Sequence, residues 1–565
     1  MILPVGTEDF GRLIHRKLDF IDKTLWIKAL FDDRGTDVAV FTRPRRFGKT
    51  LNLSMLHYFL AEKVNGEKSQ GLFDNLKIAK LGDEYMQHQG KYPVVSITLK
   101  DIKESKYENA QLKLSGLMAD VYDEHRALLC SEKLSDKQKE EFETILKRKT
   151  NEIDLQSALK KLTHYIYLHY GIKPWLLIDE YDTPIISGYM NGYYKEMIEF
   201  MRGMFGEALK TNPHIEKAVI TGILRVAKES LFSGVNNLEV YSLLRNEYGN
   251  HFGFTENEID GLLKKADMLS KAAEIKEWYN GYQIGSTTIY NPWSIVNCLK
   301  QKGQLIPYWV NTSDNQLIKD LLKKSPLEFK TEFEKLMCGG SVEKLIDENM
   351  VFQFLKNNVS SLWSLLLMSG YLKPISIQQT DQGTFAELAV PNREVRNLYR
   401  QIIEQWLSNG HGLEWYNKFI DSLLTGKIEL FKRYLEQIII QITSYHDFAK
   451  EPEAFYQGLM LGFTVSLHGS GTYQIKSNRE SGLGRFDIML IPKDKTQLGI
   501  ILELKIKEPQ ETLEEAAKRG LAQINEKKYV EELKQSGLKK ALKIGIGFLG
   551  KEFSLCAEEE DLTRN

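Results

Sequence analysis

The chain has 565 residues, about four times the length of a usual domain, so we expect two to four domains rather than one small module. Hydrophobic residues make up 42% and charged residues 27%, as in globular proteins, and no run approaches the roughly 18 apolar residues of a membrane span. Lysine and arginine number 75 against 76 acids. This balance excludes a uniformly basic nucleic-acid coat and an acidic disordered chain, so any polyanion site must be local.

The amino terminus and the cysteines indicate the compartment. The first ten residues, MILPVGTEDF, contain two acids and no basic patch before an apolar core, unlike a signal peptide. The four cysteines lie far apart without paired spacing, which argues against a disulfide framework and a thiolate zinc site. We therefore expect a cytoplasmic protein that does not enter a membrane.

The first part of the chain, residues 1–256, alternates apolar runs with helical stretches. The candidate strands are Val38 to Thr42, Val94 to Leu99, Trp175 to Ile178 and Lys217 to Thr221. Each is nearly continuous in apolar residues, as expected of a parallel sheet covered on both faces. The charged, helically spaced segment from Lys103 to Tyr170 predicts two or more amphipathic helices. We predict an α/β domain here.

The remainder predicts two further parts. Residues 257–448 show helical patterns joined by short turns and predict a mostly α connecting region. Residues 449–565 predict a small α/β domain in the order helix, strand, strand, strand, helix, strand, with the clearest strands at Arg485 to Ile491, Leu498 to Ile506 and Ile544 to Phe548.

A phosphate-binding loop is predicted in the segment VAVFTRPRRFGKT, an apolar strand and tight loop before a helix. Gly48, Lys49 and Thr50 open that helix. In a P-loop, backbone N–H groups at the helix start surround phosphate oxygens, the lysine neutralises the β- and γ-phosphates, and the hydroxyl binds Mg²⁺. Lys49 and Thr50 would take these roles.

The loop departs from the usual pattern because Arg43 replaces its first glycine, while Arg45 and Arg46 also lie in it. Residues 41–50 carry four cations and no acid. We expect Arg45 and Arg46 to bind nucleotide phosphates. A solvated basic loop is the alternative, although it does not explain the strand before and the helix after.

Acids follow a second apolar strand, WLLIDE. Asp179 would hold Mg²⁺ and Glu180 would polarise the attacking water, as in a Walker B motif, with Asp182 nearby. The run KAVITGILR adds Thr221 and Arg225 as candidates for sensing the γ-phosphate. A chance acidic strand end and a surface arginine are the alternatives.

A second site is predicted near the carboxyl terminus. Asp487 begins one strand, and Glu503 and Lys505 lie two apart on the next, so the latter two share a face. A hairpin would let the two acids hold a divalent metal while the lysine orients water and stabilises charge. The alternative is that Glu503 and Lys505 point to solvent from an edge strand.

Three other residues extend this second site. Glu453 lies in the helix-like EAFYQGLMLGF and is a candidate additional metal ligand. The helical pattern AAKRGLAQINEKKY would carry Gln523 and Tyr529 towards the site. Six residues on an ideal helix span about 600°, so we do not expect Gln523 and Tyr529 to share a face.

Several motifs together carry a resemblance to a known family: RPRRFGKT, LLIDEYDTPI, ITGILRVAKESLFSGVNNL, EWYNGY with IYNPWS, and SNRESGLGRFD with LELK and AQINEKKY. With them the chain resembles bacterial AAA-ATPase-like proteins that have a carboxyl-terminal PD-(D/E)xK nuclease domain. The resemblance implies a P-loop ATPase domain, a helical middle and a restriction-endonuclease-like α/β domain. It implies a nucleotide site at Lys49, Thr50 and Asp179, and a nuclease site at Asp487, Glu503, Lys505 and Gln523.

These motifs predict an ATP-binding, Mg²⁺-dependent nuclease whose nucleotide state controls cleavage, with Mn²⁺ as a second metal for the nuclease site. The predicted partner is nucleic acid, DNA foremost, and a homo-oligomer is a further expected form. The alternative is a nucleotide-dependent switch or adaptor that binds partners or nucleic acid without cleaving it.

Overall fold

A computed structural model describes residues 1–225, 231–232, 235–309, 316–348, 358–408, 413–442, 462–463, 467, 472–481, 484–549 and 552–563. The chain divides into two compact units. Unit 1 comprises Met1–Leu317 and Glu343–Val395, and unit 2 comprises Ile318–Val342 and Arg396–Asn565. Within the described ranges, no helix is both long enough and apolar enough to cross a lipid bilayer.

Unit 1 is built on a five-stranded parallel sheet of order β4-β5-β6-β1-β7. Its strands are β1 (Val38–Thr42), β4 (Val94–Thr98), β5 (Trp175–Asp179), β6 (Lys217–Gly222) and β7 (Leu238–Tyr241). Every residue of β1, β5 and β6 is buried, as their continuous apolar runs require in a sheet covered on both faces. All four predicted strands are confirmed.

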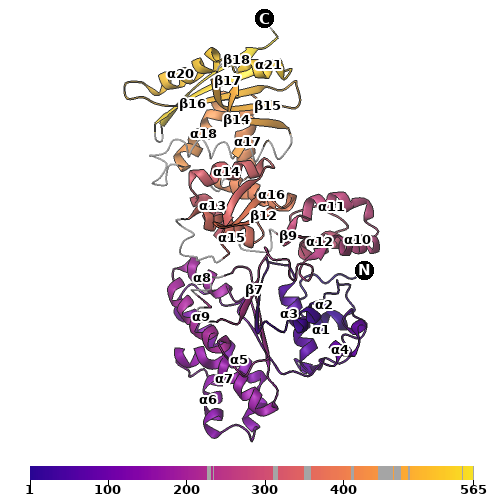
Figure 1. The fold of residues 1–565 in the computed structure, drawn as a ribbon. Coiled ribbons are helices and arrows are strands. Elements are labelled where there is room, and N and C mark those ends of the chain that lie inside the picture. The colour runs from indigo at the N-terminus through magenta and orange to yellow at the C-terminus, as the bar shows by residue number, and fades with distance from the viewer. Residues whose placement is uncertain are drawn as a thin grey trace. The chain divides into compact units, whose positions relative to one another are not determined.

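Helices flank this sheet on both sides (Figure 1). One group consists of α1 (Phe10–His15), α2 (Leu25–Asp32), α3 (Lys49–Leu60) and α4 (Asp83–Met86), with the short 3₁₀ helix Ala79–Leu81 and a small hairpin of β2 (Lys63–Val64) and β3 (Glu67–Lys68). The other consists of α5 (Tyr107–Glu124), the 3₁₀ helix Arg126–Cys130, α6 (Asp136–Leu146), α7 (Glu152–Tyr170), α8 (Thr183–Asn191) and α9 (Tyr194–Leu209).

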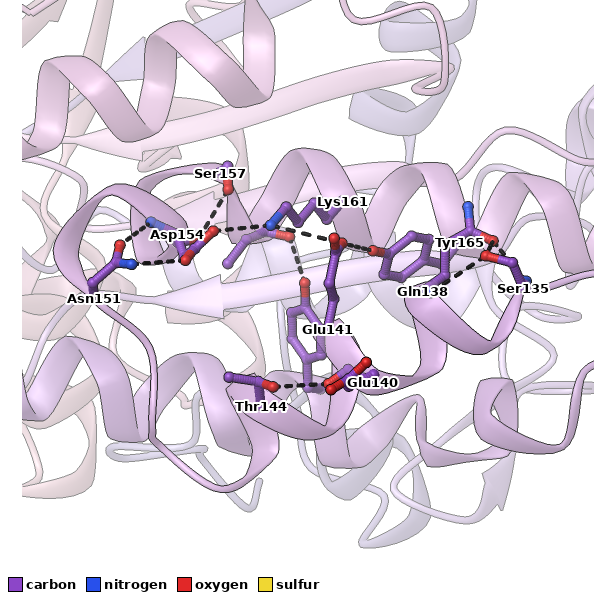
Figure 2. Close-up of polar contacts among 12 residues, drawn as sticks. Ser135, Gln138, Glu140, Glu141, Thr144, Asn151, Asp154, Ser157, Lys161 and Tyr165 are labelled. Carbon is purple, nitrogen blue, oxygen red and sulfur yellow. Dashed lines mark hydrogen bonds and ion pairs between the residues drawn. The ribbon is translucent and has the colours of Figure 1, made fainter.

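Polar contacts set the starts and the packing of α6 and α7 (Figure 2). Ser135 forms a capping box at the start of α6, and the Asn151 side chain accepts a hydrogen bond from the Asp154 N–H at 2.8 Å. Lys161 on α7 lies 3.1 Å from the Asp154 carboxylate and 3.7 Å from that of Glu141 on α6. These helices, with α5, confirm the amphipathic helices predicted for this segment.

The rest of unit 1 combines helices with two small sheets. The helices are α10 (Glu256–Lys265), the 3₁₀ helix Leu269–Lys271, α11 (Ala272–Tyr279), α12 (Pro292–Lys300) and α15 (Val359–Met368). The sheets are β8-β10-β9, formed by Phe254–Thr255, Thr287–Tyr290 and Tyr282–Ile284, and β11-β13-β12, formed by Val342–Ile346, Gly383–Ala389 and Lys373–Thr380. Helices predominate as predicted, but the two sheets were not predicted because their strands are short or largely polar. The division at residues 256 and 448 stays a prediction.

Unit 2 contains a five-stranded mixed sheet of order β14-β15-β16-β17-β18. The strands are β14 (Tyr473–Ser481), β15 (Gly484–Pro492), β16 (Gly499–Ile506), β17 (Lys540–Leu549) and β18 (Glu552–Asp561). Only β16 and β17 pair in parallel. The helices are α13 (Gln316–Lys324), α14 (Leu327–Met337), α16 (Arg393–Ser408), α17 (Leu413–Leu424), α18 (Ile428–Ile442), α20 (Leu513–Glu526) and α21 (Val530–Gln535), of which α13 and α16 begin in unit 1.

The predicted order of three strands, a helix and a fourth strand is confirmed by β14, β15, β16, α20 and β17, while the last edge strand, β18, is an addition. The run that forms β18 ends in four consecutive acids, Glu558 to Asp561, and acidic residues are depleted in strands. This segment forms a strand because it pairs with β17 along its whole length, an interaction that its own sequence does not indicate.

Helix α20 lies very close to β17. A Cβ atom on Gly545 would stand 2.1 Å from the carbonyl oxygen of Ala517, and one on Gly547 would stand 2.4 Å from that of Leu513. Two glycines on the strand therefore let the helix backbone approach the centre of the sheet. This approach carries Gln523, near the end of α20, to the neighbouring strand β16.

Candidate active sites

The predicted phosphate loop connects β1 to α3. Arg46 and Gly48 adopt positive φ angles of 68° and 83°, a conformation that costs glycine little and arginine more. The Lys49 side chain is buried, and its Nζ donates hydrogen bonds to the carbonyl oxygens of Arg43 and Pro44, each at 3.0 Å. The ammonium group is thus held within the loop at the start of α3.

Asp179 joins the other predicted nucleotide residues. Thr50 donates a hydrogen bond to Asp179 Oδ2 at 2.7 Å, and Thr221 donates to Asp179 Oδ1. Strand β6 lies between β1 and β5, so the carboxyl ends of three parallel strands meet at one edge, where ligands bind in open α/β sheets. The structure therefore brings together Lys49, Thr50, Asp179 and Thr221, which come from distant segments.

Glu180 follows β5 with a φ of 52°. Its carboxylate accepts a hydrogen bond from Thr183 Oγ1 at 3.0 Å. Burial alone would raise the pKa of Glu180, but the charge of Lys49 and the bond from Thr183 lower it below the ordinary value. Glu180 is therefore held as the charged form, which a base for water requires.

The chemistry of these groups fits a divalent cation. Burial raises the pKa of Asp179, although the bonds from Thr221 and Thr50 and the charge of Lys49 act in the opposite direction. Asp179, Glu180 and Asp182 all influence Lys49 electrostatically, so three acids face one ammonium group. A bound Mg²⁺ would offset the excess negative charge, and Thr50 and Asp179 would hold it.

Asp182 serves the backbone rather than the cation. Its Oδ2 accepts hydrogen bonds from the N–H groups of Ile223 at 2.9 Å and Leu224 at 2.8 Å. The residue is fully buried, and burial raises its pKa to about 6. Asp182 thus anchors the segment that follows β6.

Replacing Asp182 by Asn should make unfolding less dependent on pH. The pKa of Asp182 is about 6 in the folded chain, whereas the ordinary value of 3.8 applies to the unfolded chain. The folded protein therefore binds this proton more tightly than the unfolded chain does. The wild type should therefore lose stability as pH rises from about 4 to about 6. Between pH 5 and pH 8, the free energy of unfolding of Asp182→Asn, measured in urea, should rise by about 1 kcal/mol relative to that of wild type.

The control for this experiment is Asp260→Asn, which changes an exposed acid on α10. Its stability difference from wild type should be the same at both pH values. An equal difference at pH 5 and pH 8 for Asp182→Asn would contradict the assigned burial of that carboxyl group.

Arg43 does not contribute its charge to the phosphate loop. Its guanidinium is fully buried, stacks on the Phe252 ring at 5.0 Å and donates to the carbonyl oxygens of Thr42 at 2.8 Å and Tyr241 at 2.7 Å. Burial lowers its pKa to about 9. Residues 41–50 do contain four cations, but Arg43 points into the domain and connects β1 to β7 through its bonds to Thr42 and Tyr241.

The other arginines have identifiable neighbours. The exposed Arg46 guanidinium lies 4.6 Å from the Trp293 ring centre and 3.6 Å from the Glu8 carboxylate. The guanidinium of Arg225 lies 3.7 Å from the carboxylate of Glu348. The roles predicted for Arg45, Arg46 and Arg225 towards phosphates remain predictions.

The second site lies on the central strand of the unit 2 sheet. The antiparallel register pairs Ile488 with Leu502, and one further step sets Asp487 opposite Glu503. Leu504 N–H donates to Asp487 Oδ2 at 2.7 Å, and Asp487 N–H donates to Glu503 Oε2 at 3.3 Å. The predicted hairpin thus brings the two acids together.

Glu503 is almost entirely buried, with a side-chain exposure of 2%. Lys505 Nζ lies 2.8 Å from Glu503 Oε1. Burial, reinforced by the charge of Asp487, raises the pKa of Glu503 to about 7. The alternative of a solvent-facing edge strand is excluded, because β16 has a neighbour on each side and Glu503 points inward.

Gln523 and Tyr529 correct the expectation drawn from an ideal helix. Gln523 Nε2 donates to Glu503 Oε1 and to the Tyr529 hydroxyl, the latter at 3.2 Å. Helix α20 ends at Glu526, and Lys528 adopts a φ of 53°. The chain therefore turns before Tyr529, so the helical angle between the two residues does not apply.

The donor set at this second site fits a hard divalent cation. Two carboxylates on adjacent strands, one with a pKa raised to about 7, meet in a largely buried place with one ammonium group. Asp487 and Glu503 would hold the metal through oxygen. Among residues that the structure describes, no group of three or more acids, histidines or cysteines forms a metal site. Glu453, the predicted additional ligand, lies outside these residues.

Two tryptophans near the phosphate loop were not predicted to contact it. Trp293 faces Arg46, and the Trp309 indole Nε1 donates to the Arg45 carbonyl oxygen at 3.1 Å. They lie about 250 residues after the loop in the sequence. No local pattern relates segments so far apart, and a set of homologous sequences with paired changes is the signal that would.

Comparison with known proteins finds a family match for each of two parts of the chain. Residues 4–232 match the family model described as Predicted AAA-ATPase, and residues 451–558 match that of the PD-(D/E)XK nuclease superfamily. Over 563 residues the chain is 23% identical to an uncharacterized protein in the vnfD 5' region of Azotobacter chroococcum mcd 1, covering 98% of this chain and 96% of the relative. The chain therefore carries an AAA-ATPase-like domain at residues 4–232 and a carboxyl-terminal domain of the PD-(D/E)XK nuclease superfamily at residues 451–558.

Proposed function

We propose that this protein binds ATP with Mg²⁺ in unit 1, cleaves phosphodiester bonds of nucleic acid in unit 2, and uses its nucleotide state to control cleavage. The observation that carries the proposal is the convergence of Asp487, Glu503, Lys505 and Gln523 on one buried place in a domain of the nuclease superfamily. DNA is the proposed substrate and Mg²⁺ or Mn²⁺ the proposed metal.

Each residue of the unit 2 site has a distinct task in this proposal. A divalent metal at Asp487 and Glu503 would supply Lewis-acid chemistry and lower the pKa of bound water. Lys505 stabilises the negative charge that develops on the phosphoryl oxygens. Gln523 holds the Glu503 carboxylate in place through its amide, so that the carboxylate is oriented before substrate arrives.

The unit 1 residues have corresponding tasks towards nucleotide. Lys49 exchanges its two loop carbonyls for phosphate oxygens, and Gly48 lets the loop approach them. Thr50 and Asp179 hold Mg²⁺, and Glu180 polarises the attacking water. Arg45 and Arg46 bind phosphate oxygens, and Arg225 responds to the γ-phosphate.

The proposal is tested with the purified full chain and four substrates, namely linear duplex DNA, circular duplex DNA, single-stranded DNA and RNA. Each is incubated with Mg²⁺, Mn²⁺ or EDTA, with and without ATP. We expect metal-dependent cleavage that EDTA abolishes, that changes with ATP, and that falls at least roughly a hundredfold in Asp487→Asn.

The alternative function, a nucleotide-dependent switch or adaptor, predicts that the protein cleaves none of these substrates. If wild type cleaves none of the substrates while ATP changes its oligomeric state in light scattering, the proposed nuclease activity is wrong. Equal cleavage by wild type and Asp487→Asn would also overturn it, because a contaminating nuclease would then explain the activity.

A further inference from the structure

Trp309 links the phosphate loop to the start of another helix. It is 1% exposed. Its indole Nε1 donates to the carbonyl oxygen of Arg45 at 3.1 Å, and its backbone N–H donates to Glu394 Oε1 at 2.6 Å. One buried residue thus contacts both the loop and the second residue of α16.

The hydrogen bond to Arg45 constrains the loop at the atoms that a nucleotide would use. Because a peptide bond is planar and trans, the carbonyl of Arg45 and the N–H of Arg46 point in opposite directions and rotate together. By holding the carbonyl, Trp309 sets the direction of the N–H. Any phosphate that redirects this N–H must also move or break the contact with Trp309.

Glu394 is held by several donors in the interior of unit 1. It is fully buried, and its Oε2 accepts a hydrogen bond from Ser294 Oγ at 2.7 Å. Burial raises its pKa to about 7, against the bonds from Ser294 and from the Trp309 and Tyr308 backbone. A buried carboxyl group is costly unless its donors remain in position, so its place depends on Trp309 and Ser294.

A second set of contacts connects the same loop with the same carboxyl group. The Arg46 guanidinium stacks on Trp293, the residue before Ser294 on α12. The Phe47 ring packs edge-on against Tyr282 at 5.0 Å between ring centres. Arg46 and Phe47 of the loop therefore pack against residues that lie beside Ser294 and Glu394.

Helix α16 begins in unit 1 beside these contacts and continues into unit 2. The helix runs from Arg393 to Ser408, and its residues up to Val395 belong to unit 1 while those from Arg396 belong to unit 2. Its start is fixed within unit 1, because Asn392 Nδ2 donates to the Asn280 carbonyl oxygen at 2.9 Å and Asn392 Oδ1 accepts from Val395 N–H at 3.0 Å. Because backbone hydrogen bonds join each turn of a helix to the next, a shift of the first turn of α16 would act on the residues that follow it.

We propose that Trp309 and Glu394 form a relay that transmits the nucleotide-dependent orientation of the Arg45–Arg46 peptide to α16, and through that helix to the unit that carries Asp487 and Glu503. The relay rests on the proposed function, since it presumes that ATP and cleavage are coupled. Both are positioning residues, because they act through the loop and the helix rather than on the reacting atoms.

The test uses Trp309→Phe, which removes the indole N–H and keeps an aromatic ring. The matched control is Trp26→Phe, which changes another fully buried tryptophan of unit 1 whose Nε1 has no hydrogen-bond partner among the described residues. A second relay variant, Glu394→Gln, keeps the side-chain size. The measured quantity is the ratio of cleavage rates of the full chain with and without ATP.

We expect Trp309→Phe and Glu394→Gln to bring this ratio to within about twofold of one, while Trp26→Phe keeps the wild-type ratio. ATP affinity of Trp309→Phe should fall by no more than about fivefold, the value of one hydrogen bond, so saturating ATP separates lost coupling from lost binding. A wild-type ratio in both relay variants would overturn the relay and leave the proposed function standing. A ratio of one in wild type itself would refute nucleotide control, and the relay with it.

Discussion

Glu503→Gln is expected to reduce metal-dependent cleavage by roughly a thousandfold. Gln keeps the size of the side chain but removes the charge that would hold a divalent cation between β15 and β16. It also replaces one of the two oxygens that now accept hydrogen bonds from Lys505, Gln523 and Asp487. The measurement is the initial cleavage rate on the best substrate at saturating Mg²⁺ or Mn²⁺.

The same variant should remain folded with a free energy of unfolding close to that of wild type, because the amide avoids the cost of a buried charge while it loses acceptor bonds to Lys505 and Gln523. A large loss of cleavage in a folded variant separates a catalytic from a structural role. Burial raises the pKa of Glu503 to about 7, so the charged form is disfavoured by folding and a neutral amide avoids that cost. The matched control is Glu559→Gln on β18, where an exposed acid pairs with Lys540, and it should cleave at the wild-type rate. Cleavage by Glu503→Gln at that rate would show that this acid holds no metal.

Lys49→Ala is expected to weaken ATP binding at least roughly a hundredfold. The Lys49 ammonium is buried at the start of α3, and burial lowers its pKa while the carboxylates of Glu180 and Asp179 act against that change. Removing it leaves these acids without a compensating charge at the place that phosphates must approach, so charge repulsion adds to the lost hydrogen bonds. Isothermal titration of the full chain with ATP and Mg²⁺ measures the loss.

The control for this second experiment is Lys160→Ala, which removes an exposed lysine on α7 that pairs with Glu207. Its ATP affinity should equal that of wild type. Cleavage without ATP should be unchanged in Lys49→Ala, because the variant leaves unit 2 intact. If Lys49→Ala bound ATP as tightly as wild type, the nucleotide site would have to lie elsewhere.

Much of the architecture followed from short sequence patterns. The strands β1, β5 and β6 were predictable because a strand buried on both faces must be apolar at every position. The pairing of Asp487 with Glu503 followed from a hairpin and a two-residue period. In each case the deciding interactions lie within a few residues or across one turn.

Other features depended on segments far apart in the sequence. The side chain of Arg43 turns away from the phosphate loop because Phe252 and the Tyr241 carbonyl receive it. Tyr529 reaches Gln523 because the chain leaves the helix at Lys528 and folds back. Neither partner can be identified from the residues beside Arg43 or Gln523.

By itself the sequence determined which groups are available for chemistry and on which strand or helix end they lie, because spacing along a strand or helix sets which face a side chain occupies. Only the tertiary structure decided which groups meet. Burial and long-range packing set the raised pKa of Glu503, the inward turn of Arg43 and the contact of Trp309 with both Arg45 and Glu394. These depend on free energies gained when distant segments exclude water together, which no local pattern encodes.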